Sequence, residues 1–134
     1  MKAVYATGTN YDDPLSVLEV GTMPEPETKP FWSTIRVNSA SVNHHDVWSL
    51  QGVGLSDEQT PMILGTDAAG VLEEDIPVRK GLKAGSEVVL YTFVGTDGAG
   101  VMPGERRSIL SERYAGTMAE YTQVPSANVF AKPA

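Results

Sequence analysis

Apolar residues occur along the chain in short runs in which polar residues alternate with them, and glycine or proline separates the runs. An alternation with period two places successive side chains on opposite faces of a β-strand. In the segment 31–42, Ser33, Ile35 and Val37 share one face, and the polar residues between them share the other. The pattern therefore predicts a strand in this segment.

Other short segments also have the composition of strands. Thirteen glycines and nine prolines supply turn signals between these segments, and residues 25–30 form a proline-bounded loop. Many short strands with a single helix start predict a mainly β fold with short helices, in the form of a barrel or a sandwich. The further predicted strands are residues 1–7, 15–21, 66–74, 86–94 and 118–125.

The one predicted helix start lies in the stretch VNHHDVWSLQG, residues 42–52. Asn43 is a favoured N-cap residue, and Asp46 three positions later can interact with the free amide groups of the first turn. We expect Trp48 and Leu50 to anchor the helix on the rest of the fold.

The same stretch contains His44 and His45, the only histidines of the chain. Consecutive helical residues point about 100° apart, whereas zinc-binding helices space their ligands three or four residues apart. A metal site on these two rings is therefore disfavoured. The residues themselves leave open whether the rings serve chemistry or only the helix start.

The composition limits the class of protein. The chain has 134 residues, of which 41% are hydrophobic, and this suits one globular domain. Its formal net charge of −7 argues against nucleic-acid binding, and no apolar run is long enough to span a membrane. The chain has no cysteine and no signal peptide pattern, so we expect a cytoplasmic protein without disulfides or thiolate metal sites.

The glycine-rich segment 95–104 lacks the third glycine of a dinucleotide fingerprint and the Lys-Ser/Thr pair of a P-loop. We expect residues 95–115 to be the most mobile segment, although the charged run 105–113 could form a short helix. Gly65 and Gly70 are interpreted as glycines at a bulge or at a close backbone approach within a strand.

Taken in order, five segments resemble the N-terminal, GroES-like half of the medium-chain dehydrogenase/reductase superfamily. The resemblance covers nearly the whole chain except residues 95–115, and it implies a GroES-like, partly open β-barrel over residues 1–134. The segments are MKAVYAT, SASVNHHDVWSLQG, PMILGTDAAGVLEE, GLKAGSEVVL and GTMAEYTQVPSANVFAKP.

The resemblance also bears on metal binding. Zinc-dependent members have a cysteine ligand at the position of Asn43, a histidine ligand at Thr66 and a glutamate at Asp67. Their second, structural zinc uses four cysteines in the region of residues 95–115, and this chain has none. The resemblance is thus to the zinc-free branch of quinone oxidoreductases and enone reductases, and we expect no metal.

By the same resemblance, the helix start faces the cofactor cleft. Asn43 would lie near the nicotinamide and His44 near the pyrophosphate, while His45 occupies the place of a proton-relay hydroxyl. Whether His45 relays a proton or only packs remains open. The other implied roles are substrate binding for Trp48 and Thr66, and structural support for Asp46, Gly65, Asp67 and Gly70.

In the family, this half is followed by a Rossmann domain that carries most of the NAD(P) contacts. We therefore expect a fragment of a longer NAD(P)H-dependent reductase that acts on a small carbonyl, enone or quinone substrate and is able to form a homodimer. The alternative is a stand-alone binding module without catalysis.

Overall fold

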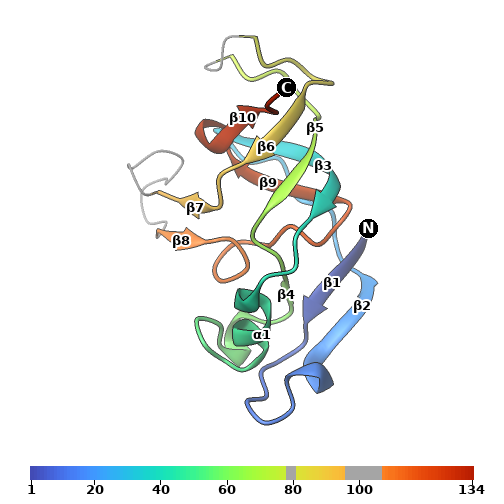
Figure 1. The fold of residues 1–134 in the computed structure, drawn as a ribbon, viewed down its shortest axis with the longest axis vertical. Helices are drawn as coiled ribbons and strands as arrows, with labels where there is room; N and C mark the ends of the chain where they lie inside the picture. The colour runs from blue at the N-terminus through green and yellow to red at the C-terminus, as the bar shows by residue number, and fades with distance from the viewer. Residues whose placement is uncertain (78–80, 96–106) are drawn as a thin grey trace.

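The computed structural model describes residues 1–77, 81–95 and 107–134 (Figure 1). In these ranges, short antiparallel strands dominate, with one α-helix, α1 (His44–Leu50), and three short 3-10 helices. The predicted mainly β fold with short helices is confirmed. The strands are β1 (Lys2–Ala6), β2 (Leu18–Thr22), β3 (Trp32–Ala40), β4 (Met62–Ile63), β5 (Ala68–Leu72), β6 (Glu87–Leu90), β7 (Phe93–Val94), β8 (Ser108–Ile109), β9 (Tyr121–Pro125) and β10 (Val129–Ala131), and the 3-10 helices are Pro14–Val17, Asp57–Gln59 and Ser126–Asn128.

The described strands form three antiparallel sheets, and none of these sheets closes on itself. One sheet has the order β2-β1-β4, a second the order β10-β6-β5-β3-β9, and a third pairs β7 with β8. Figure 1 shows α1 and the three-stranded sheet toward one end of the molecule, and much of the five-stranded sheet toward the other. The long strand β3 runs between β5, the central strand of the larger sheet, and β9 at its edge.

The alternation predicted for residues 31–42 appears in β3. Ser33 and Ile35, on one face of the strand, are buried, whereas Arg36 on the opposite face is exposed. The prediction of a strand here is therefore confirmed. Ile35 pairs with Leu72 of β5 on one side and with Thr122 of β9 on the other. All three side chains are about 1% exposed, which places the centre of β3 in the core.

A close backbone approach explains the glycine of β5. Gly70 pairs with Val37 of β3, and the register of the two strands shifts just after this pair. A Cβ atom on Gly70 would overlap the carbonyl oxygen of Arg36 and would lie 2.8 Å from Cγ2 of Ile35. Any larger residue would push β5 away from β3, so glycine is required here.

Two apolar clusters form the core among the described residues. The larger cluster includes Ile35 and Leu72 of the five-stranded sheet, and the smaller one joins Ala6 of β1 to Leu50 of α1. Leu50 therefore anchors the helix, as predicted. The same prediction is wrong for Trp48, whose side chain is 48% exposed. The helix instead turns Ser49 and Asp46 inward.

The predicted strand 86–94 is interrupted after β6. The side-chain amide of Asn128 donates hydrogen bonds to the carbonyl oxygens of Tyr91 and Phe93, both at 2.9 Å. The backbone of Asn128 accepts a further bond from the Tyr91 amide at 2.8 Å. These bonds replace the ladder of a continuous strand, and β7 then pairs with β8.

Other predicted boundaries also differ from the structure. The predicted strand 15–21 begins as the 3-10 helix Pro14–Val17 before β2 starts. The helix suggested for 105–113 is wrong for its described part, residues 107–113, which contains β8 instead. The expected mobility of residues 95–115 concerns mainly residues 96–106, which lie outside the described ranges.

Candidate functional site

A cluster of polar side chains lies at the start of α1. The Asn43 amide nitrogen, Nδ2, is 2.6 Å from Oδ2 of Asp67, and an ionised carboxylate can only accept. The same nitrogen lies 3.2 Å from the hydroxyl oxygens of Ser41 and Thr66. Both hydroxyls in turn donate to Asp67 Oδ2, at 3.1 Å and 3.3 Å. One carboxylate oxygen thus collects three donors.

Asp46 fixes this cluster to the rest of the fold. Asn43 is the N-cap of α1 with an extended backbone, which confirms the predicted helix start. The buried Asp46 carboxylate accepts the Asn43 N–H at 2.8 Å and the Gly65 N–H at 2.9 Å. One side chain therefore satisfies a free amide of the helix start and positions the loop that carries Thr66 and Asp67.

Gly65 lies before β5 rather than within a strand, which corrects one part of its interpretation. Its φ angle is +94°, and a Cβ atom there would lie 2.5 Å from Oγ1 of Thr117 and 3.0 Å from the amide nitrogen of Met118. The hydroxyl of Thr117 donates to the Asp67 carbonyl oxygen at 3.0 Å. Glycine thus permits a tight turn that holds the backbone of Asp67 against the segment before β9.

An open hollow of about 500 Å³ lies beside the cluster. Small side chains from the ends of β3 and β5 line most of it, and Val89 and Leu90 of β6 close one side. Ser41 and Asp67 belong to both the hollow and the hydrogen-bonded cluster. Asp67 is the one titratable residue among the described residues that line the hollow.

His45 lies apart from this hollow and contacts a different carboxylate. Its Nε2 atom is 3.0 Å from Oε1 of Glu112, and the two side chains are 19% and 28% exposed. The other ring nitrogen, Nδ1, is buried and has no hydrogen-bond partner among the described residues.

His44 and Trp48 form a third group on the outer face of α1. Their rings stack with centroids 5.1 Å apart and planes 30° apart, as expected for residues four positions apart on a helix. Both side chains are exposed, and neither lines the hollow.

The structure therefore brings together only some of the predicted site residues. Asn43, Thr66 and Asp67 converge, with Asp46 and Gly65 supporting them, whereas His44, His45 and Trp48 point elsewhere. Thr66 is buried, and its hydroxyl is engaged by Asn43 and Asp67. Gly70 serves the packing of β5 on β3.

Ser41 and Glu112 are not among the site residues predicted from the sequence. The run of small residues at the end of β3, from Ser39 to Ser41, was the one local signal for the hollow. No local signal points to Glu112, which follows His45 by 67 residues.

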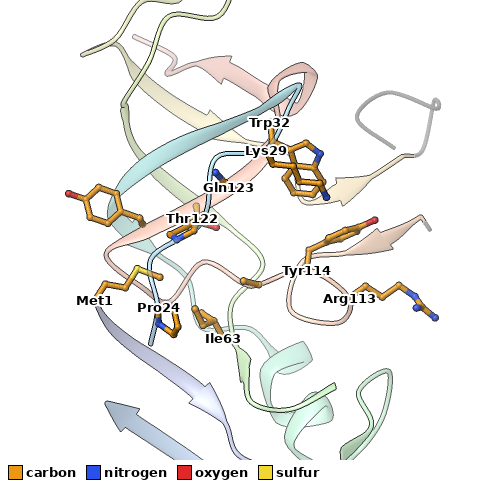
Figure 2. A pocket seen from close by; sticks show the side chains of 12 residues that line it. Met1, Pro24, Lys29, Trp32, Ile63, Arg113, Tyr114, Thr122 and Gln123 are labelled. Atoms are coloured by element: carbon orange, nitrogen blue, oxygen red, sulfur yellow. The ribbon is translucent and has the colours of Figure 1, made fainter. Parts of the chain in front are cut away.

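A second cleft, of about 290 Å³, opens at the other end of β3 (Figure 2). Trp32 and Tyr114 line it with ring centroids 5.1 Å apart, and Lys29 places its ammonium group 4.2 Å from the centroid of the Trp32 ring. In Figure 2, Pro24 and Met1 lie on the opposite side of this cleft from Tyr114. None of the predicted site residues lines this cleft.

Comparison with known proteins identifies the family. The family described as "Alcohol dehydrogenase GroES-like domain" matches residues 29–134. The chain belongs to this family. Among curated proteins, none matches significantly.

Solved structures agree with this assignment of a GroES-like domain. An NAD-dependent alcohol dehydrogenase is 36% identical with a TM-score of 0.80, and 99% of this chain aligns with 40% of it. A cobalt- and zinc-bound thermostable alcohol dehydrogenase from Pyrobaculum aerophilum is 29% identical with a TM-score of 0.76, over 98% of this chain and 40% of that one. The alcohol dehydrogenase of the hyperthermophilic archaeon Aeropyrum pernix is 25% identical with a TM-score of 0.76, over 99% of this chain and 40% of that one. The GroES-like domain thus spans about 40% of the length of these structures.

Zinc in one of these structures raises the question whether the present GroES-like domain suits a metal. Zinc sites in proteins use thiolate, imidazole and carboxylate ligands. The cluster around Asn43 offers an amide, two hydroxyls and one carboxylate, and the amide N–H group is directed at that carboxylate. The described residues contain no group of three or more His, Asp or Glu side chains arranged to hold a metal ion. This donor set does not fit zinc.

In the described parts of the GroES-like domain, no helix has the length and apolar character that crossing a membrane requires.

Proposed function

We propose that this domain forms the substrate side of a zinc-independent, NAD(P)H-dependent oxidoreductase that reduces a small carbonyl, enone or quinone compound. One observation carries the proposal: the open hollow beside Asp67, with the cluster of Asn43, Ser41 and Thr66 at its edge. Membership of the alcohol dehydrogenase GroES-like family supports the class of reaction. The donor set around Asn43 supports the absence of zinc.

A bound reduced nicotinamide would supply the hydride in this reaction. We propose that most contacts to the cofactor come from a further domain, because the chain contains no complete dinucleotide fingerprint. Within the GroES-like domain, Asn43 and His44 would lie on the cofactor side of the helix start. The small side chains of Ala68 and Ala69 leave room for a planar ring beside them.

Without a metal, hydrogen-bond donors must polarise the substrate oxygen. Ser41 carries a hydroxyl in the lining of the hollow, and it would donate to the substrate oxygen in exchange for its hydrogen bond to Asp67 Oδ2, because a hydroxyl has one hydrogen. That carboxylate also disfavours anionic substrates, since no cationic side chain is present among the described residues that line the hollow. A neutral substrate is therefore proposed.

The experiment is a hydride-transfer assay with NADH and NADPH deuterated at the transferring position. It compares a neutral aldehyde, an enone and a quinone, using residues 1–134 alone and a polypeptide that joins this domain to a nicotinamide-binding domain. We expect hydride transfer only with the longer polypeptide, seen as deuterium on carbon for the aldehyde or the enone and as oxidation of the cofactor for the quinone, whose hydroquinone O–H groups exchange with water. Its absence for all three substrates would refute the proposed function. Efficient transfer by residues 1–134 alone would refute the proposal that most contacts to the cofactor come from a further domain.

A further inference from the structure

The cleft beside Trp32 joins three parts of the chain that are distant in the sequence (Figure 2). Its walls come from the loop before β3, from the segment after β8 and from β9. Its volume of about 290 Å³ lies near the lower end of the range for ligand sites in proteins, which is about 300–1,000 Å³. A compound with a single ring therefore suits this space, whereas a dinucleotide does not.

One wall of the cleft is aromatic and held in place by the sheet. The rings of Trp32 and Tyr114 have centroids 5.1 Å apart and planes tilted by 53°. Trp32 is only 8% exposed, and it pairs with Pro125 of β9. Pro24 lies on the opposite side of the cleft from Tyr114 in Figure 2. A flat apolar group in the cleft would thus contact aromatic rings on one side and a proline ring on the other.

The lining also contains two cationic side chains. The Lys29 ammonium lies 4.2 Å from the centroid of the Trp32 ring and 5.4 Å from that of Tyr114. Arg113, which is exposed, also lines the cleft. The described residues of the lining include no acidic side chain. An ammonium group has three hydrogens to donate, so Lys29 can bind a ligand as well as contact the rings.

These charges favour one sign of ligand. The chain has a formal net charge of −7 and therefore repels anions at long range. Attraction of an anion to the cleft must come from nearby side chains, within the screening length of about 8 Å at physiological salt. A cationic ligand is disfavoured, because Lys29 already lies over the Trp32 ring and would repel it. The cleft thus suits a negatively charged group that is attached to a flat ring.

We propose that this cleft binds a small aromatic carboxylate, with its ring against Trp32 and Tyr114 and its carboxylate toward Lys29. Lys29 is partly shielded from solvent, so it should contribute more to binding than the exposed Arg113. The site shares no lining residue with the hollow beside Asp67. This inference does not rest on the proposed function, because it requires neither a cofactor nor hydride transfer.

The first test is a titration of residues 1–134 with benzoate, followed by ¹H–¹⁵N NMR at the indole N–H signals of Trp32 and Trp48, the two tryptophans of the chain. We expect a saturable shift of the Trp32 signal with a dissociation constant on the order of 1 mM, as suits so small a ligand, and no saturable shift of the Trp48 signal. Benzamide and benzylammonium carry the same ring with a neutral or a positive group. Both should bind at least about tenfold more weakly than benzoate.

The second test substitutes the lysine of the cleft. Lys29→Met keeps an unbranched side chain beside the rings and removes the charge. It should weaken benzoate binding by about tenfold and leave benzamide binding within about twofold. Lys132→Met, at a lysine outside the cleft, changes the net charge by the same amount and is the matched control. Its affinity for benzoate should equal that of the natural sequence.

Three results would overturn the proposal: no saturable shift at Trp32, equal affinities for benzoate and benzamide, or equal effects of the two lysine substitutions. Intermolecular NOEs in the natural sequence locate the ligand without any variant. The ring protons of benzoate should give NOEs to the rings of Trp32 and Tyr114. NOEs to other parts of the chain alone would contradict the assigned site, even if Lys29→Met failed to fold.

Discussion

The side-chain amide nitrogen of Asn43 lies 2.6 Å from Oδ2 of Asp67. This bond joins the start of α1 to the loop before β5, and it points an N–H group at the one carboxylate of the cluster. Asn43 therefore makes a hydrogen bond at the position where, by the resemblance, zinc-dependent members of the family have a metal ligand. The relationship connects the fold of the helix start to the chemistry proposed for the hollow.

Asp46 should be a main determinant of stability at this site. Its buried carboxylate accepts two backbone N–H groups, and Asp46→Ala would leave both without a partner. We expect the free energy of unfolding to fall by about 3 kcal/mol, measured by urea denaturation. Asp57 also accepts two hydrogen bonds, both from Thr9, but it is exposed. Asp57→Ala should therefore cost about 1 kcal/mol or less, and equal losses would contradict the argument from burial.

Gly65→Ala tests whether the turn before β5 depends on both conformation and space. Gly65 and Gly81 have similar positive φ angles, +94° and +88°, but a Cβ atom on Gly81 would meet nothing within 4 Å. Gly81→Ala should cost about 1 kcal/mol from backbone strain alone. Gly65→Ala adds overlap with Thr117 and Met118 and should cost about 3 kcal/mol. Thermal unfolding of the two variants side by side measures the difference, and similar midpoints would count against the close approach.

Asp75 should make stability depend on acid pH. The Ala84 N–H donates to its carboxylate at 2.9 Å and the Lys83 ammonium at 3.3 Å, and these contacts hold the pKa of Asp75 below its ordinary value of 3.8. A lowered folded-state pKa stabilises the fold above 3.8, and this contribution disappears as the pH falls through the folded-state pKa. Asp75→Asn should thus be less stable than the natural sequence at neutral pH, and the difference should disappear once the pH lies below the folded-state pKa of Asp75. A difference that persists unchanged in acid would refute this origin.

Part of the fold follows from local pattern. The alternation around Ile35 predicts β3 because one face of that strand is buried along its first half. Asn43 predicts the helix start because N-cap preference is a local property. The break after β6 could not be predicted, since it depends on the side chain of Asn128 folding back onto Tyr91 and Phe93. Such tertiary contacts override strand composition.

The residues of the candidate site could also be predicted only in part. Resemblance to the family brings Asn43, Thr66 and Asp67 to attention, and these residues do converge. Trp48 shows the limit of local reasoning, because an aromatic residue in a short helix can lie on either face. Glu112 is beyond such reasoning altogether, since only the folded chain brings it to His45.

The central claim is oxidoreductase chemistry without zinc, and one measurement tests it most directly. The rate of NAD(P)H-dependent hydride transfer is measured in the protein that carries the nicotinamide-binding domain, before and after exhaustive treatment with a chelator. The account predicts a rate that stays within about twofold after treatment, because the cluster around Asn43 uses hydrogen bonds alone. A fall to less than about a tenth that added zinc restores would contradict it.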